Sequence, residues 1–378
     1  MKNDYQVCSR CILDTNDYPA ISFDNQGVCS VCHIYDDMAR KTVKRGDEAD
    51  KVLQNMLTEV KNWGINREYD CLIGVSGGVD STYLSYKAKE WGLRPLILHV
   101  DNGWNTELSV MNIENLIKKL GFDLFTYVID WNEIKDLQLS YMKASVLDID
   151  VPTDNAYAAA VFKIANDKGI KYILTGHNTV TEGWLPPTFT HFKYDIINMK
   201  AIHKQFGSVP LKSFPYLGVT KGWYYMKIKG LKTYSPLNWI DYDKGAVKKF
   251  IQEEMGWRDY GGKHYENIFT RFYQGYILYK KFGVDKRKSH LSTLICSGQI
   301  SRAEALAEIK KNPYPSEELL FEDRDFLIKK LGITELEFES IMALPVKAHT
   351  DYPSILHWYD RLRPYVRAFR KIKQSIRK

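Results

Sequence analysis

Between residues 70 and 184, short apolar runs alternate with amphipathic segments. Four runs, at residues 71–75, 95–100, 124–129 and 170–174, have the length of buried strands. In the stretches between them, apolar residues recur every three or four positions, which is the spacing of a helix that packs one face. Strands that alternate with helices predict an α/β fold built on a doubly wound parallel sheet. In such sheets, ligands bind beyond the carboxyl ends of the strands.

The segments on either side of this alternation have different patterns. Residues 37–69 are polar and then helical, and we interpret them as a helical connector. Residues 185–242 are rich in aromatic residues, proline, glycine and lysine without a regular period. This composition fits either an insertion that forms a lid over the ligand or peripheral packing. Helical spacing returns at 244–256 and 301–310, so residues 243–378 are predicted to form a helical C-terminal region with a basic tail.

Composition and charge narrow the class of protein. Of the 378 residues, 44% are hydrophobic and 26% are charged, which is typical of a soluble globular protein with a sizeable core. The sequence shows neither a signal peptide nor an apolar stretch that could span a bilayer, so we expect a cytoplasmic location. The net charge is +7, yet Arg361 to Lys378 contain eight Lys or Arg residues and no acid, which leaves −1 for the other 360 residues. A body close to neutral argues against a broad nucleic-acid-binding surface.

The basic tail also carries apolar residues at helical spacing, namely Leu362, Val366, Phe369 and Ile372. This pattern predicts a basic amphipathic helix. Three interpretations remain open: a terminal helix packed on the body, a docking surface for an acidic partner, or contact with anionic lipid. Because the apolar stripe is short and contains no Trp, we favour packing over membrane contact.

Two Cys-x-x-Cys pairs lie within the first 36 residues. Cys8 and Cys11 form one pair, Cys29 and Cys32 form the other, and seventeen residues separate the pairs. This is the spacing of a four-thiolate zinc site. Since four thiolates complete the tetrahedral shell of the ion, a structural rather than a catalytic zinc is expected. Residues 1–36 are therefore predicted to form a zinc module.

A glycine-containing turn directly follows the first apolar run. Its geometry, strand then turn then helix start, presents free backbone N–H groups and the positive end of a helix dipole to an anion such as phosphate. Paired glycines let the backbone approach that anion closely, the hydroxyl groups add donors, and the aspartate can bind a Mg²⁺ ion that phosphates also bind. The turn comprises Ser76, Gly77, Gly78, Val79, Asp80, Ser81 and Thr82.

This turn lacks the Gly-Lys-Ser/Thr ending of a Walker A loop. It resembles the SGGxDS pyrophosphate-binding loop of N-type ATP pyrophosphatases, which release pyrophosphate and transfer AMP to an oxygen of the substrate. The resemblance implies that residues 70–184 form an ATP pyrophosphatase (PP-loop) domain of the adenine nucleotide alpha-hydrolase-like type.

Two further strand ends are predicted to lie near this loop. Asp101 follows the second apolar run, and the sequence Thr-Gly-His-Asn follows the fourth. The latter, together with Glu182, resembles the second nucleotide and metal segment of PP-loop ligases. That resemblance implies nucleotide contacts by Gly176, His177 and Asn178 and Mg²⁺ binding by Glu182 beside Asp80. From the residues alone, His177 could also be a satisfied polar group at a strand end.

The cysteine module, the PP loop, the Thr-Gly-His-Asn segment and residues 261–300 together resemble the N-acetyl sugar amidotransferases. The similarity covers nearly the whole chain, with the basic tail outside it. It implies an AMP-forming C–N ligase of bacterial lipopolysaccharide O-antigen and nonulosonic-acid biosynthesis. Such an enzyme converts the acetamido group of a nucleotide-linked sugar to an acetamidino group. The cofactors implied are ATP, Mg²⁺ and a structural Zn²⁺.

The source of the ammonia is argued from the remaining cysteines. A class I glutaminase carries Gly-x-Cys-x-Gly, and the first glycine is missing around Cys296. A class II enzyme uses an N-terminal Cys, whereas position 2 is Lys, and Cys71 lies in a predicted buried strand. We therefore expect ammonia from a separate glutaminase subunit, as the family resemblance also implies.

Basic residues outside the loop supply further candidates for phosphate contacts. Lys286 and Arg287, with Lys288 and Arg271, either bind phosphate or form a solvated charge run.

Two other classes of function remain open. A PP-loop tRNA-thiolating enzyme could use the same loop but needs sulfur-carrying cysteines near it. A non-catalytic zinc nucleic-acid-binding module would need an extended basic face, so we expect no nucleic-acid partner.

Overall fold

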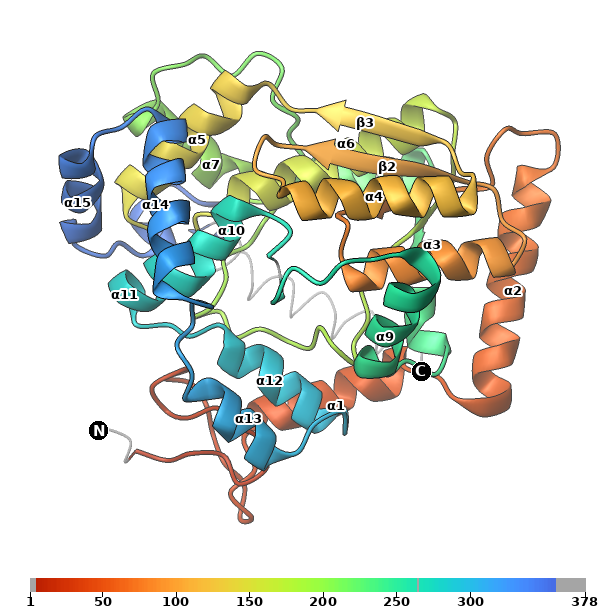
Figure 1. Ribbon diagram of the computed structural model, residues 1–378, viewed down its shortest axis with the longest axis horizontal. Helices are drawn as coiled ribbons and strands as arrows, with labels where there is room; N and C mark the ends of the chain where they lie inside the picture. The colour runs from red at the N-terminus through yellow and green to blue at the C-terminus, as the bar shows by residue number, and fades with distance from the viewer. Residues whose placement is uncertain (1–4, 264, 358–378) are drawn as a thin grey trace, which may run out of the picture.

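The computed structural model describes residues 5–263 and 265–357. Within them, five strands form a parallel sheet in the order β3-β2-β1-β4-β5 (Figure 1). Four of these strands coincide, within one or two residues, with the four apolar runs, so the doubly wound parallel sheet is confirmed. The strands are β1 (Cys71–Val75), β2 (Pro95–Asp101), β3 (Leu124–Val128), β4 (Tyr172–Leu174) and β5 (Lys232–Tyr234).

The chain builds this sheet outward from β1 in two directions. It adds β2 and β3 on one side and then returns to add β4 and β5 on the other. In the register of the sheet, Leu72 of β1 pairs with Ile173 of β4, so the carboxyl ends of these two strands are neighbours. A reversal of strand order at this point opens a crevice beyond the strand ends, where doubly wound folds bind ligands.

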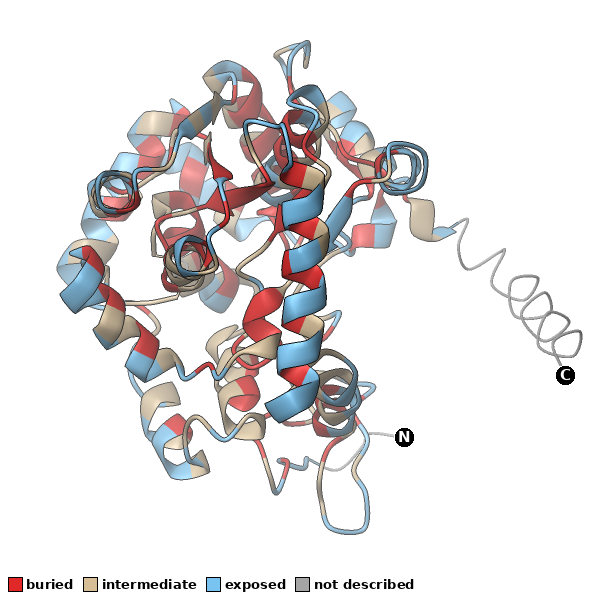
Figure 2. Cartoon of the chain, turned by 90° about the vertical axis from the view of Figure 1, so that its right-hand side faces the viewer, coloured by how far each residue is buried: buried red, intermediate tan, exposed pale blue. Residues whose placement is uncertain are grey.

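Successive residues of a strand point to opposite faces of the sheet, so an apolar strand has side chains to bury on both faces. Helices cover both faces of this sheet. Ile73 of β1 belongs to a buried cluster with residues of α2, α3, α4 and α9, whereas Leu72 belongs to a cluster with residues of α6. Buried and exposed positions alternate along α2, as expected of a helix with one packed face (Figure 2). These helices are α2 (Gly46–Gly64), α3 (Val79–Glu90), α4 (Glu107–Leu120), α6 (Val151–Asp167) and α9 (Lys244–Met255).

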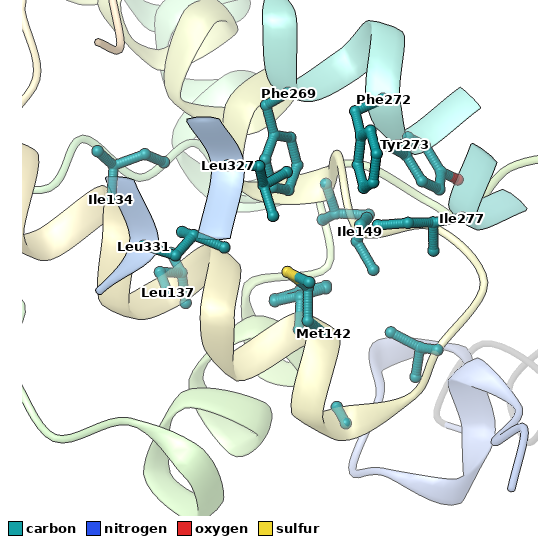
Figure 3. Close-up of a cluster of buried hydrophobic side chains, with 14 of the residues drawn as sticks. Ile134, Leu137, Met142, Ile149, Phe269, Phe272, Tyr273, Ile277, Leu327 and Leu331 are labelled. Carbon is teal, nitrogen blue, oxygen red and sulfur yellow. The ribbon is translucent and has the colours of Figure 1, made fainter. Parts of the chain in front are cut away.

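A separate core joins the middle of the chain to the C-terminal helices (Figure 3). In it, Leu137 of α5 (Trp131–Ala144) packs in one cluster with Phe269 of α10 and Leu327 of α14. The predicted helical C-terminal region is therefore present from residue 243 to residue 357. The remaining helical elements are α1 (Ser30–Thr42), α7 (Ile196–Phe206), α8 (Val219–Trp223), α10 (Ile268–Phe272), α11 (Leu278–Phe282), α12 (Arg287–Cys296), α13 (Arg302–Ile309), α14 (Glu317–Leu331), α15 (Glu335–Ala343), the π-helical η1 (Tyr224–Ile228) and η3 (Tyr273–Ile277), and the 3₁₀ turns η2 (Pro236–Trp239) and η4 (His349–Asp351).

Residues 185–242 differ from the expected insertion, because they complete the sheet. The edge strand β5 lies parallel to β4, and its residues Lys232 and Tyr234 donate hydrogen bonds to the carboxylate of Glu59 on α2. The loop after α7 is held from α5, where Glu133 accepts hydrogen bonds from three successive backbone N–H groups, those of residues 212, 213 and 214. This segment is thus an integral part of the α/β unit.

Among the described residues, no helix has the length and apolar character needed to cross a membrane. The amphipathic helix predicted for the basic tail lies outside the described residues.

Candidate active site

The two Cys-x-x-Cys pairs meet in one buried cluster. The sulfur atoms of Cys8, Cys11, Cys29 and Cys32 all lie within 4.8 Å of one another. The Sγ–Sγ distances are 3.8 Å for Cys8–Cys32, 3.7 Å for Cys11–Cys29 and 3.6 Å for Cys29–Cys32. A tetrahedron with Zn–S bonds of about 2.3 Å has edges of about 3.8 Å. The four cysteines therefore fit a zinc ion and could bind one.

The cysteine cluster is fixed to the C-terminal helices, below the sheet in Figure 1. The guanidinium of Arg302 on α13 donates hydrogen bonds to the backbone carbonyls of Cys11 (3.0 Å) and Cys8 (3.2 Å). The thiol of Cys296 on α12 lies 3.6 Å from Cys32 Sγ. Sequence reasoning considered Cys296 only as a nucleophile, and no local motif indicated its place beside the cluster.

The predicted PP loop, residues 76–82, comprises the turn between β1 and α3 and the first turn of α3, and it is held by packing from two directions. Gly77 has φ +79°, and a Cβ there would lie 2.5 Å from the backbone oxygen of Ser109 on α4. Its carbonyl accepts a hydrogen bond of 2.8 Å from Trp257 Nε1. Gly78 is the N-cap of α3 and has no side chain to cap the helix, so the first N–H groups of α3 remain available to an anion.

A cavity of about 740 Å³ opens beyond the ends of β1 and β4. Several predicted site residues line it, and Gly77 and Thr82 support the loop from behind without lining the cavity. Asn178 is also buried behind the lining, where its side chain reaches Asp80 Oδ1 at 3.3 Å. The predicted residues that line the cavity are Ser76, Gly78, Val79, Asp80, Ser81, Gly176, His177, Glu182 and Lys286.

Two carboxylates, Asp80 and Glu182, lie near each other at the loop end of this cavity. Burial and the negative charge of Glu182 raise the pKa of Asp80. Glu182 contacts His177 Nδ1 at 2.7 Å and Lys263 Nζ at 3.2 Å. Two carboxylates that destabilise each other in a buried site fit a hard divalent cation, which would relieve their repulsion. Asp80 and Glu182 could thus hold Mg²⁺.

Two lysines that sequence reasoning missed also line this end of the cavity, Lys244 at the start of α9 and Lys263 in the segment before α10. Burial, followed by the positive charge of Lys263, lowers the pKa of Lys244, while Asp80 and Glu182 oppose the shift. Lys263 lies in the 261–300 stretch and Lys244 outside it, but no local signal in the sequence singles out either lysine, so their place at the loop becomes visible only in the fold. A pair of cations beside a phosphate loop can neutralise a polyphosphate.

Asp101, predicted to contact the nucleotide, stabilises a turn instead of facing the main cavity. Its carboxylate accepts hydrogen bonds from the backbone of Gly103 (2.8 Å) and from Asn105 Nδ2 (3.1 Å). It lines a neighbouring cavity of about 420 Å³, and His99 and Asn105 line both cavities. Asp101 therefore lies beside the PP-loop site, at the end of β2.

The predicted basic group is divided among different partners. Arg271 forms a buried two-bond pair with Asp323, both N–O distances being 2.7 Å. Arg287 pairs with Asp285 at 2.7 Å and does not line the cavity, although we expected it to contact phosphate. Lys288 Nζ pairs with the carboxylates of Asp14 and Asp17 of the cysteine module, at 2.7 and 2.8 Å. Of the group, Lys286 is the member that lines the cavity.

Comparison with known proteins adds a family match for the C-terminal region. Residues 266–363 match the family model described as "LPS biosynthesis protein WbpG-like, C-terminal domain". The C-terminal part of the chain resembles this domain. An uncharacterized protein of Methanocaldococcus jannaschii is 21% identical over 313 residues, which cover 82% of this chain and 95% of that protein.

Two solved structures show weaker similarity. An NMN synthetase from Francisella tularensis matches with a TM-score of 0.29 and 15% identity, over 55% of this chain and 87% of that one. An NH₃-dependent NAD synthetase from Campylobacter jejuni subsp. jejuni matches with a TM-score of 0.28 and 13% identity, over 55% and 93%. The fold assignment rests on the strand order and register described above.

Proposed function

We propose that this protein is an ATP-using ligase of bacterial surface-polysaccharide biosynthesis that converts the acetamido group of a nucleotide-linked N-acetyl sugar to an acetamidino group. The observation that carries the proposal is the convergence of the PP loop, Asp80, Glu182, Lys244 and Lys263 on one cavity. The WbpG-like C-terminal match supports the pathway, because that family is described by its place in LPS biosynthesis.

The proposed reaction activates a poor electrophile in two steps. The acetamido oxygen attacks the α-phosphorus of ATP, the bond to the bridging oxygen breaks, and pyrophosphate leaves. Ammonia then attacks the amide carbon, loses a proton and expels AMP, so that the acetamido oxygen leaves on AMP. Positioning of the two reactants and electrostatic stabilisation of the leaving group supply most of the catalysis in such a site.

The chain's own residues have defined roles in this scheme. The N-terminus of α3 and the hydroxyls of Ser76 and Ser81 bind the departing phosphates, and Lys244 and Lys263 neutralise their charge. Asp80 and Glu182 would hold Mg²⁺, which supplies charge stabilisation to the pyrophosphate when bound.

We also propose that ammonia comes from a separate glutaminase subunit. None of the described residues that line the cavity is a cysteine. Cys71 is buried in β1, where burial raises its pKa, and Cys296 packs beside the cysteine cluster. Neither position suits a nucleophile for glutamine or a sulfur carrier for tRNA thiolation. The purified chain should therefore use ammonium salts and fail to hydrolyse glutamine, as an ammonia-release assay would show.

The decisive experiment replaces the loop carboxylate. Asp80→Ala should lower the formation of AMP and pyrophosphate by at least about a hundredfold, since one metal ligand next to the reacting phosphates is lost. Asp325→Ala, at an exposed aspartate of α14, is the matched control and should leave turnover unchanged. Near-normal turnover of Asp80→Ala, or ADP and phosphate as the wild-type products, would overturn the proposal.

A further inference from the structure

A second group of charges at the main cavity comes from elements other than those that carry the PP loop, Lys244 and Lys263. We call it the distal cluster; it comprises Asp148, Asp150, Asp154, Lys193 and Lys286. It is assembled from the loop before α6, the first turn of α6, the loop before α7 and the start of α12. Of these residues, Asp150, Asp154, Lys193 and Lys286 line the cavity, while Asp148 is buried behind them.

Two of the three carboxylates of the distal cluster form ion pairs with Lys193. Lys193 Nζ lies 2.7 Å from Asp148 and 2.8 Å from Asp154, so it bridges the two. Asp150 is 5% exposed and accepts a hydrogen bond from the hydroxyl of Thr270. Burial, followed by the negative charge of Asp154, raises the pKa of Asp150 to about 7, so near neutral pH it is partly protonated.

Among the described residues, the side chain of Lys286 has no hydrogen-bond or ion-pair partner, although it lines the cavity. Burial, followed by the positive charge of Lys193, lowers its pKa. Lys286 is half-buried, and an ammonium group that loses water without gaining a hydrogen bond is unfavourable, so an anion from outside the chain would stabilise it.

The cavity that Lys286 lines also offers neutral groups that suit an oxyanion. Thr153 and Gln274 line it, whereas the hydroxyl of Thr190, which lines it too, donates to Asp148. Gln274 comes from η3, a π-helical turn inserted between α10 and α11, and such turns are frequent at functional sites. Hydroxyl and amide groups can donate to a phosphate or carboxylate that an adjacent ammonium attracts.

Lys286 also faces different charges from the lysines of the PP loop. The groups that act on it are Lys193, Asp148, Asp154 and Asp150. By contrast, Lys244 is influenced by Lys263, Asp80 and Glu182. The lysines that line the cavity therefore fall into two groups: Lys244 interacts with the charges of the PP-loop site, and Lys286 interacts with those of the distal cluster.

We propose that Lys286 forms a second anion-binding subsite, which binds an acidic group, phosphate or carboxylate, of the acceptor substrate rather than the triphosphate of ATP. This inference rests on the proposed function and deepens it, because it places the acceptor in the same cavity as the PP loop. An acceptor fixed at both its acidic group and its acetamido group would present the amide oxygen to the α-phosphate in one orientation.

The test uses the full-length protein and calorimetry with two probes. α,β-Methylene-ATP with Mg²⁺ fills the triphosphate site, and UDP is then titrated into the saturated protein. Lys286→Met should weaken UDP binding at least tenfold and change the affinity for α,β-methylene-ATP less than twofold. Lys286→Arg, which retains the charge, should keep UDP binding within a few-fold of wild type and confirms that the site tolerates substitution. Lys280→Met, at an exposed lysine of α11, is the charge-matched control and should change neither affinity.

Each outcome decides the proposal. If UDP does not bind, glucuronate replaces it as the carboxylate probe, and binding that depends on Lys286 supports the subsite. Weaker α,β-methylene-ATP binding by Lys286→Met with unchanged UDP binding assigns Lys286 to the triphosphate and overturns the proposal. Absence of binding by both acidic probes also overturns it. If wild-type protein forms ADP and phosphate, the proposed function fails, whereas Lys286-dependent binding of UDP would still establish the subsite.

Discussion

The substitution Gly77→Ala adds one methyl group to the PP loop and so tests how closely the loop packs against α4. Gly77 has φ +79°, and an L-residue in this left-handed region costs about 1 to 2 kcal/mol. The new Cβ would also lie 2.5 Å from the backbone oxygen of Ser109, so the loop or α4 must shift. Such overpacking costs about 1 to 3 kcal/mol. We therefore expect the free energy of unfolding to fall by about 2 to 5 kcal/mol.

Gly121→Ala separates the two contributions. Gly121 has a similar φ of +67°, ends α4, and has no atom within 4 Å of the added Cβ. This variant should lose only the conformational part, about 1 to 2 kcal/mol. Urea unfolding monitored by fluorescence measures both, and AMP formation should fall in Gly77→Ala alone because Gly77, unlike Gly121, belongs to the loop that we propose binds the phosphates of ATP. Equal destabilisation by the two substitutions would show that α4 yields freely and that the loop is not fixed by this contact.

Three further results are expected. Cys8→Ser should lower the free energy of unfolding, since a structural metal contributes folding free energy, and it should lower the zinc content below one ion per chain. Metal analysis that finds no zinc in the intact wild-type protein would contradict the zinc assignment. Asp150→Asn should flatten the pH dependence of stability between about pH 4 and pH 7. In the folded wild type, Asp150 keeps its proton up to a pKa of about 7, whereas in the unfolded chain the carboxyl loses it near the usual pKa of about 3.9. Between these two values the folded state binds more protons than the unfolded state, so the stability of the wild type falls as pH rises. Arg271→Met should cost about 3 to 5 kcal/mol of stability by leaving Asp323 buried without its guanidinium, while ATP-analogue affinity, measured by calorimetry, stays unchanged.

The sequence predicts the four strands that form apolar runs, including β3, whose residues are half-buried or exposed, and it misses the short edge strand β5. β1 reads as a continuous apolar run because both of its faces are covered by helices. β5 consists of Lys232, Thr233 and Tyr234, and its stability depends on β4 and on the carboxylate of Glu59, which lies 173 residues away from Lys232 in the chain. Periodicity cannot detect a strand whose partners are so distant.

The site shows the same limit. The PP loop is recognisable because its chemistry is contiguous in the sequence, whereas Lys244, Lys263 and the distal cluster come from segments that only the fold unites. From the sequence, the basic residues 286–288 are either candidates for phosphate contacts or a solvated charge run. Successive residues at the start of a helix point about 100° apart, so Lys286 lines the cavity, Arg287 pairs with Asp285, and Lys288 reaches the cysteine module.

The attachment of the cysteine module to α12 and α13 has a consequence for the order of biosynthesis. Arg302, which binds the carbonyl of Cys11, follows it by 291 residues. At a translation rate of ~5–20 residues per second, the thiols leave the ribosome about 15 to 60 s before their covering helices exist. During that interval, a metal ion bound to the four thiolates would protect them against oxidation. Zinc supplied during expression, rather than after purification, should therefore determine how much of the chain folds correctly.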